Sequence, residues 1–229
     1  MFNLAEDLMI LAIDDEKGKV VSSAAIPLDY ALVGALIMEL SLSGKISIKD
    51  DNIFVADNNY PEKPLLNDFL RVIDNEKEDR SVKSIVIRLV NEFKEIEDII
   101  IKSLIEKGVL REENHKILWV FNFVRYPATD DSEEKTLIAH IKEIVLEGKS
   151  PDVRTAVLIS LLRVCNLIDE VFSKEDLESS VERIKEISYS NDVIKAVSQS
   201  VFEIQQAILS TITNSGMIPP NSDMLSSKF

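Results

Sequence analysis

The stretch that decides the fold reads SIVIRLVNEFKEIEDIIIKSLIEKG at residues 84–108 and continues as VLREENHKILWVFNFVRYP at residues 109–127. In its first half, apolar residues recur every three or four positions, the spacing of one helix face: Ile85, Leu89, Phe93, Ile96, Ile100 and Leu104. This pattern predicts one long helix with a continuous apolar face, ended by Gly108. The second half has two β-rich runs around a polar segment at residues 112–116, which predicts a hairpin that turns there.

The second run of this hairpin is strongly apolar. Large apolar side chains fill almost every position: Ile117, Leu118, Trp119, Val120, Phe121 and Phe123. Strict alternation would place Leu118 and Val120 on one face and the other four on the opposite face. A strand that is apolar on both faces is either buried on both or exposes one to a partner or a bilayer. Trp119 suits a membrane interface, and the residues alone leave both interpretations open.

Length and composition indicate a mainly helical, globular protein. The 229 residues are 45% hydrophobic, with only six glycines and seven prolines, fewer than a loop-rich β protein needs. The single cysteine, Cys165, excludes an intramolecular disulfide and fits a reducing cytoplasm, and its apolar neighbours predict that it is buried. No stretch reaches the roughly 20 apolar residues of a membrane span. We therefore expect a cytoplasmic protein that is either soluble or peripheral on the cytoplasmic face of a membrane.

The net charge of −14 argues against a nucleic-acid partner, because phosphates repel an acidic chain unless its basic residues gather on one face. The helix expected at residues 28–42 contains no Lys or Arg. The lysines at 94 and 102 are flanked by Glu95, Glu97 and Asp98. The sequence therefore lacks the basic recognition helix that a winged-helix DNA-binding protein requires.

Helix caps, apolar periodicity and breakers predict the remaining elements. Asn3 and Glu6 form a capping box at the start of a first helix. A small hairpin is expected around residues 49–51. Further helices are expected at residues 28–42, 64–75, 133–147, 152–172, 174–187 and 192–212, of which the helix at 152–172 is apolar nearly all round. These elements would form one domain at residues 1–213, followed by a flexible tail at residues 214–229.

Two segments share one order of elements. Residues 38–55 and 102–121 each contain helix, glycine, strand, polar turn and strand. This is the layout of a winged-helix unit used twice. The alternative interpretation is that the two segments are unrelated, and that each has independently acquired a helix followed by a hairpin.

No group of residues in the sequence predicts catalysis or a cofactor. His115 and His140 lie far apart, without Cys or carboxylate at ligand spacing, so no metal site is expected. The motifs G-x-S-x-G, G-x-G-x-x-G and the P-loop are absent. The forty acidic residues show no spacing that singles out an acid/base pair. We therefore expect a protein that is not an enzyme.

Four segments occur in a fixed order along the chain: LAEDLMILAIDDEKGK, LVGALIMELSLSGKI, LIEKGVL and DVRTAVLISLLRVCNLIDEVF. In this order and spacing they resemble the Golgi phosphoprotein 3 family, the phosphatidylinositol-4-phosphate-binding membrane adaptors of the Golgi, which also has prokaryotic members. The resemblance covers roughly residues 3–213. It implies a mostly helical single domain, a protruding apolar hairpin that inserts into the membrane, and a shallow basic pocket for the lipid headgroup.

The family's headgroup pocket uses one tryptophan and three arginines, and by this resemblance their positions fall at Ala24, Val33, Lys94 and Glu97. Only Lys94 keeps the positive charge, and Glu97 reverses it. A phosphomonoester is usually held by several Arg or Lys donors, so the resemblance does not carry phosphatidylinositol-4-phosphate specificity. The family's arginine-bearing N-terminal extension for coat-protein contact is also missing. These departures point to a prokaryotic relative.

Two functional hypotheses follow. The first is a non-catalytic, peripheral phospholipid-binding module of phosphoinositide-like type. In it the hairpin around Trp119 enters the membrane interface, and Lys94 with the nearby Arg88 meets an anionic headgroup. The second is a soluble protein-interaction module or homo-oligomer, with the same hairpin buried against another chain. Neither involves a cofactor or nucleic acid.

Overall fold

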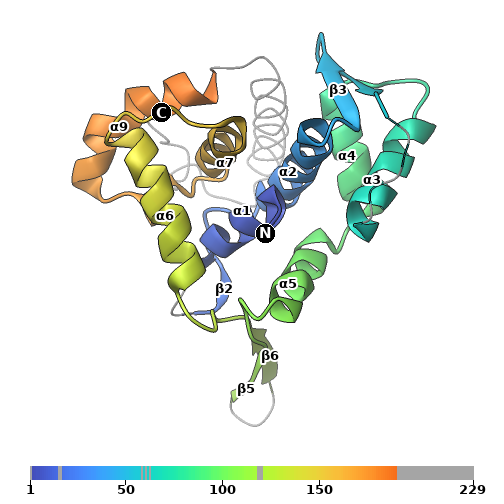
Figure 1. The fold of residues 1–229 in the computed structure, drawn as a ribbon. Coiled ribbons are helices and arrows are strands. Elements are labelled where there is room, and N and C mark those ends of the chain that lie inside the picture. Colours follow the sequence, from blue (N-terminus) through green and yellow to red (C-terminus); the bar gives the residue numbers. More distant parts are fainter. Residues whose placement is uncertain are drawn as a thin grey trace, which may run out of the picture.

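The chain folds around two adjacent helices, α1 (Leu4–Ala12) and α2 (Leu28–Leu42), with the other helices on either side of them (Figure 1). The computed structural model describes residues 2–14, 17–57, 59, 61, 63–117 and 121–189, without the side chains of residues 115–117 and 121–123. The further elements are β1 (Ile13–Asp14), β2 (Lys19–Val20), β3 (Ile46–Lys49), β4 (Asn52–Val55), α3 (Pro64–Asn75), α4 (Val82–Glu92), α5 (Ile96–Glu106), β5 (Glu113–Ile117), β6 (Phe121–Arg125), α6 (Ser132–Val145), α7 (Val153–Val164), α8 (Ile168–Val171) and α9 (Lys174–Ser188). Over these residues the protein is a single, mainly helical globular domain with small antiparallel hairpins, as predicted.

The core is centred on α1 and α2, as their apolar sequences require. Every residue of α1 is buried, and α2 is buried along most of its length. The predicted capping box starts α1: the Asn3 side chain accepts from the Glu6 N–H at 2.9 Å, and the Glu6 carboxylate accepts from the Asn3 N–H at 2.8 Å. α2 contacts α1, α3, α4, α5 and α7. The predicted bounds of α2 and α3 are confirmed, and those of α6 and α9 are shifted by one or two residues.

The single long helix predicted across residues 85–104 is wrong, because the structure has two helices there. α4 and α5 are separated at Phe93, which leaves the helical conformation with φ −110° and ψ 59°. The Phe93 ring packs against Phe69 of α3, with 4.7 Å between ring centroids. The break lets α4 pack on α2 and α3 while α5 packs on α1 and α2. Tertiary packing therefore decides where the helix ends, even though the regular spacing of apolar residues continues through the break.

The buried helix predicted over residues 152–172 is also interrupted. Asn166 takes the left-handed conformation, φ 56°, between α7 and α8. The N–H of Leu167 donates to the carbonyl of Leu162 at 2.9 Å, the bond that closes a left-handed helix end. The apolar residues on both sides stay in the core, so the periodicity continues across the turn. Cys165 in this turn is buried, as predicted, and burial raises the pKa of its thiol.

The hairpin predicted after Gly108 is present but turns later in the sequence. β5 and β6 pair antiparallel, with Glu113 opposite Arg125 and Ile117 opposite Phe121. The predicted polar turn at residues 112–116 therefore lies almost entirely in β5, and residues 118–120 connect the strands. A two-stranded ribbon that stands off the core does not need apolar residues throughout. For this reason the polar residues of β5 were predicted to be a turn, although they belong to a strand.

The predicted repetition of element order is present in the fold. α2 is followed by Gly44 and the hairpin β3–β4, and α5 is followed by Gly108 and the hairpin β5–β6. Both glycines take the left-handed conformation, with φ 71° and 75°. The helix predicted at residues 192–212 and the tail at 214–229 lie outside the described residues.

A buried carboxylate fixes α5 against α1. Glu6 is only 1% exposed and accepts hydrogen bonds from the Lys107 ammonium and, at 2.6 Å, from the Ser103 hydroxyl. Burial opposes its ionisation, but these hydrogen bonds hold the pKa of Glu6 below its ordinary value. Because a buried charge is tolerated only when it is paired, this contact holds the C-terminal end of α5 against α1.

A second charge network joins α1, α2 and α7. Arg154 donates hydrogen bonds to the carboxylates of Asp7, at 2.9 Å, and Glu39, and to the carbonyl of Phe2 at 2.8 Å. Neither network can be predicted from local sequence, because the partners of each lie on different helices far apart in the chain.

Candidate functional site

The base of the β5–β6 hairpin is attached to the domain by backbone hydrogen bonds. The Tyr126 N–H donates to the Gly18 carbonyl at 2.7 Å, and the Arg111 N–H donates to the Pro127 carbonyl at 3.0 Å. Gly18 has φ 59°, and a side chain there would bring Cβ within 2.9 Å of the Pro127 nitrogen. The turn between β1 and β2 therefore lies directly against the hairpin base.

Beyond this base the hairpin projects away from the helices (Figure 1). β5 and β6 make their main contacts with each other. Of the six predicted hairpin residues, Ile117, Phe121 and Phe123 lie in the paired strands. Leu118, Trp119 and Val120 form the connection and lie outside the described residues. The predicted division of these side chains between two faces stays a prediction.

The four positions matched to the family's headgroup pocket lie in two different environments. Ala24 and Val33 are both 0% exposed and belong to the hydrophobic core. Lys94 is exposed in the connection between α4 and α5, and Glu97 is half-buried on the first turn of α5. Only Lys94 and Glu97 are therefore within reach of a ligand in solvent.

Carboxylates gather around Glu97, and we call Asp29, Glu97 and Asp98 the acidic cluster. Burial, and after it the charges of Asp29 and Asp98, raise the pKa of Glu97 to about 7. Burial also raises the pKa of Asp29. A position that the resemblance assigned to a cationic pocket thus lies in a negative environment. No local sequence pattern predicts this environment, because Asp29 and Glu97 are brought together only by the packing of α2 on α5.

The two cations expected at an anionic headgroup are not equally available. Arg88 forms an ion pair with Glu76. Lys94 is exposed and makes no ion pair with any residue that the structure describes. One of the two predicted headgroup contacts is therefore already engaged within the protein.

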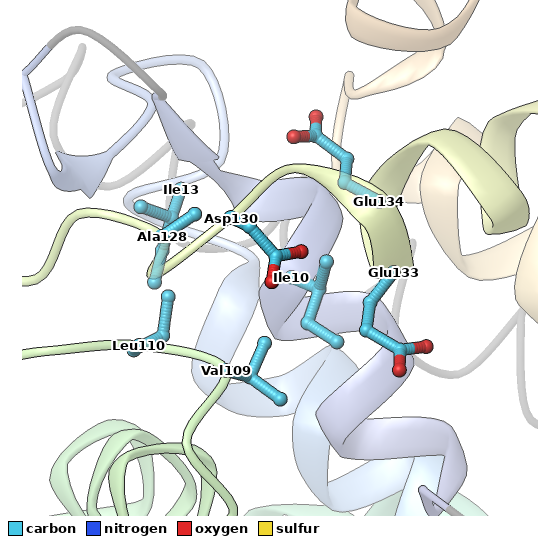
Figure 2. Close-up of a pocket in the computed structure, with 8 residues that line it drawn as sticks. All are labelled: Ile10, Ile13, Val109, Leu110, Ala128, Asp130, Glu133 and Glu134. Carbon is cyan, nitrogen blue, oxygen red and sulfur yellow. The ribbon is translucent and has the colours of Figure 1, made fainter.

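A small hollow lies between α1, the chain leading into and out of the hairpin base, and the start of α6 (Figure 2). Its apolar walls and acidic rim come from eight residues: Ile10, Ile13, Val109, Leu110, Ala128, Asp130, Glu133 and Glu134. None of these is a histidine, cysteine, serine, lysine or arginine. The hollow therefore offers three carboxylates but no thiol, no imidazole and no cation.

The described residues contain no group of three or more His, Cys, Asp or Glu placed to hold a metal ion. Of the two histidines, His115 lies in β5, not in a turn, and the ring of His140 lies 3.3 Å from the Thr155 hydroxyl. No helix in the described part of the chain is both long enough and apolar enough to cross a bilayer.

Taken together, the fold and site define a class: a helical domain with a hairpin that projects from a firmly attached base. The chain belongs to the Golgi phosphoprotein 3 (GPP34) family, whose model matches residues 4–204. The resemblance found in the sequence is thereby confirmed. Membership of this family suggests a Golgi-associated, non-enzymatic adaptor.

Two relatives illustrate the similarity, and both are named vacuolar protein sorting-associated protein 74. The protein from Eremothecium gossypii is 22% identical over 239 aligned positions, which cover 90% of this chain and 71% of the relative. The protein from Schizosaccharomyces pombe is 24% identical over 207 positions, covering 79% of this chain and 60% of the relative. At least a quarter of each relative thus lies outside the similarity.

Proposed function

We propose that this protein is a non-enzymatic, peripheral adaptor that docks on an anionic membrane surface through the β5–β6 hairpin. The observation that carries this proposal is the hairpin's projection from the domain (Figure 1), combined with the apolar sequence Leu118–Trp119–Val120 that connects its strands. Burying about 200 Å² of apolar surface contributes about 5 kcal/mol. That is enough for reversible docking, but not for permanent insertion.

The charge distribution gives little support to recognition of one phosphorylated headgroup, so the proposal rests mainly on the apolar contact of the hairpin, to which nearby basic residues would add. A phosphomonoester site needs several cations, whereas Lys94 lies close in sequence to the acidic cluster. Two other basic residues, Lys116 and Arg125, flank the hairpin connection in the sequence, whereas Arg111 is paired with Glu113 at 3.0 Å. Each cation near an anionic surface contributes on the order of 1 kcal/mol, so these residues would add to the apolar contact.

Vesicle flotation tests the proposal. The protein is mixed at low salt with vesicles of phosphatidylcholine alone, with phosphatidylglycerol added, and with phosphatidylinositol-4-phosphate added to the same total charge. We expect flotation with both anionic mixtures to a similar extent, and little with phosphatidylcholine. Trp119→Asp should abolish flotation, and Trp119→Phe should retain most of it. Failure of the wild-type protein to float with any anionic vesicle would overturn the proposal.

A second candidate is association with another protein chain, including a second copy of this one, through the same hairpin. The hairpin has only two strands, so the outer edge of each carries unpaired backbone groups of the kind that add a further strand. Light scattering distinguishes this candidate. A stable oligomer that becomes monomeric on Trp119→Asp, together with no flotation of the wild type, would favour it over membrane docking.

A further inference from the structure

Backbone hydrogen bonds join the two chain segments that lead into and out of the β5–β6 hairpin, which together form its base. The Arg111 N–H donates to the Pro127 carbonyl at 3.0 Å, and the Thr129 N–H donates to the Val109 carbonyl at 2.8 Å. Both pairs keep the register of β5 and β6. The base of the hairpin is therefore a continuation of its own ladder, which reaches down to the helical domain.

The turn between β1 and β2 lies against the outgoing segment of this base. The Tyr126 N–H donates to the Gly18 carbonyl at 2.7 Å. A Cβ atom at Gly18 would lie 2.9 Å from the Pro127 nitrogen, 3.0 Å from the Pro127 Cδ and 3.1 Å from the Tyr126 nitrogen. The contact therefore leaves no room for a side chain at Gly18 unless backbone atoms move.

Hydrogen bonds also fix this turn to α1. The Gly18 N–H donates to the Asp14 carbonyl at 2.7 Å, and the Lys17 N–H donates to the Asp14 carboxylate at 2.8 Å. After the turn, the Val21 N–H donates to the carbonyl of Ala12, the last residue of α1, at 2.9 Å. Every residue of α1 is buried. The turn therefore connects the core of the domain with the base of the hairpin.

The contact distinguishes Gly18 from glycines that have a similar backbone conformation. The other left-handed glycines in the part of the chain that the structure describes are Gly44, Gly108 and Gly148. At each of these, nothing lies within 4 Å of the place where a Cβ would be. They require glycine for their positive φ, whereas Gly18 requires it both for its φ of 59° and for its contact with the hairpin base.

We propose that Gly18 is a positioning residue for membrane docking: its contact with Tyr126 and Pro127 lets the β1–β2 turn hold the hairpin at a fixed angle to the domain before any surface is bound. This inference rests on the proposed membrane function. A hairpin that is already fixed loses little conformational freedom when it docks, so more of its apolar contact appears as affinity. A hairpin that moves at its base must instead be ordered during docking.

Vesicle flotation of Gly18→Ala tests the proposal, with Gly44→Ala as the matched control. Both variants place a side chain on a left-handed residue and carry backbone strain, but of the two, only Gly18→Ala adds an atom against the hairpin base. With vesicles of phosphatidylcholine and phosphatidylglycerol at low salt, we expect Gly18→Ala to lower the partition coefficient about fivefold. Gly44→Ala should leave it nearly unchanged. Circular dichroism confirms that each variant is folded under the conditions of the assay.

Amide hydrogen exchange of the wild-type protein is a second test, which does not depend on whether a variant folds. A base that is fixed before docking predicts that the Tyr126 and Arg111 amides exchange slowly in the free protein, and that vesicles change their rates little. In Gly18→Ala the Tyr126 amide should exchange faster. Exchange of the wild-type Tyr126 amide at the rate of an unprotected amide, with protection only after vesicles are added, would overturn the proposal.

The outcomes also separate the role of Gly18 from the proposed function. Weaker flotation of Gly18→Ala alone, with slow exchange at Tyr126 in the wild type, supports the positioning role. Equal flotation of Gly18→Ala and the wild type, or an equal loss in Gly44→Ala, would overturn that role and leave membrane docking standing. Absence of wild-type flotation with any anionic vesicle would overturn both.

Discussion

Replacing Glu97 with glutamine changes the stability of the protein in a way that depends on pH. In the folded state the pKa of Glu97 is raised from 4.5 to about 7, chiefly by burial. The folded protein therefore binds the proton more tightly than the unfolded chain does. By linkage, the stability that the folded protein gains from binding this proton more tightly is complete below pH 4.5, and it is lost as the pH rises through about 7.

The magnitude follows from the two pKa values. The interval from 4.5 to about 7 corresponds to roughly 3 kcal/mol, at about 1.4 kcal/mol for each pH unit. Because Glu97 is only half-buried, water screens part of this energy, and we expect about 1–2 kcal/mol. The glutamine side chain does not ionise, so the variant does not have this pH-dependent loss of stability. The variant should therefore be more stable than the wild type by this amount at pH values well above 7, and nearly equal to it below pH 4.5.

Urea unfolding followed by circular dichroism measures this difference across the pH range. Subtracting the wild-type free energy of unfolding from that of the variant cancels the titration of the groups that do not interact with Glu97. Glu106→Gln, on the exposed surface of the same helix, should give a difference that is nearly independent of pH. A constant difference for Glu97→Gln, or a variant that is less stable than the wild type at high pH, would refute this account of the acidic cluster.

Three further changes test the packing around the hairpin base and the core. Lys107→Met removes the cation from the buried Glu6 carboxylate and should lower the free energy of unfolding by about 3 kcal/mol, as measured in urea; adding Glu6→Gln should restore part of the loss. Gly18→Ala places a side chain at φ 59° and against Pro127, so it should cost about 1–2 kcal/mol in the same assay. Cys165 is buried, and burial raises the pKa of its thiol, so a thiol reagent should label it only in molecules that have opened or unfolded, and labelling as fast as that of a free thiol would contradict its burial.

Local sequence chemistry predicted the elements whose limits are set by local contacts. The capping box of Asn3 and Glu6 gave the start of α1, and apolar composition with a following glycine gave α2. Prediction from local sequence failed where tertiary packing sets the end of a helix. Phe93 breaks the predicted long helix by packing on Phe69 from another helix, and Asn166 takes a left-handed turn within an uninterrupted apolar pattern.

The candidate site was predictable only in part, for a similar reason. The apolar hairpin is a continuous segment, so the sequence revealed it, although the position of its turn was wrong. The acidic cluster brings together Asp29 and Glu97 from two different helices, and no local sequence pattern predicts that these residues are neighbours. The burial of Ala24 and Val33 likewise depends on the assembled core. Substitution at a family position shows which charge is lost, but only the fold shows what surrounds the replacement.

The most direct test of the central claim uses the hairpin's own fluorophore, because Trp119 is the only tryptophan in the chain. Its emission is recorded as vesicles of phosphatidylcholine and phosphatidylglycerol are added at low salt, with and without brominated lipid. Docking through the hairpin predicts a shift to shorter wavelength and strong quenching by the brominated lipid. Protein that floats with the vesicles while the emission of Trp119 stays unchanged and unquenched would contradict the claim.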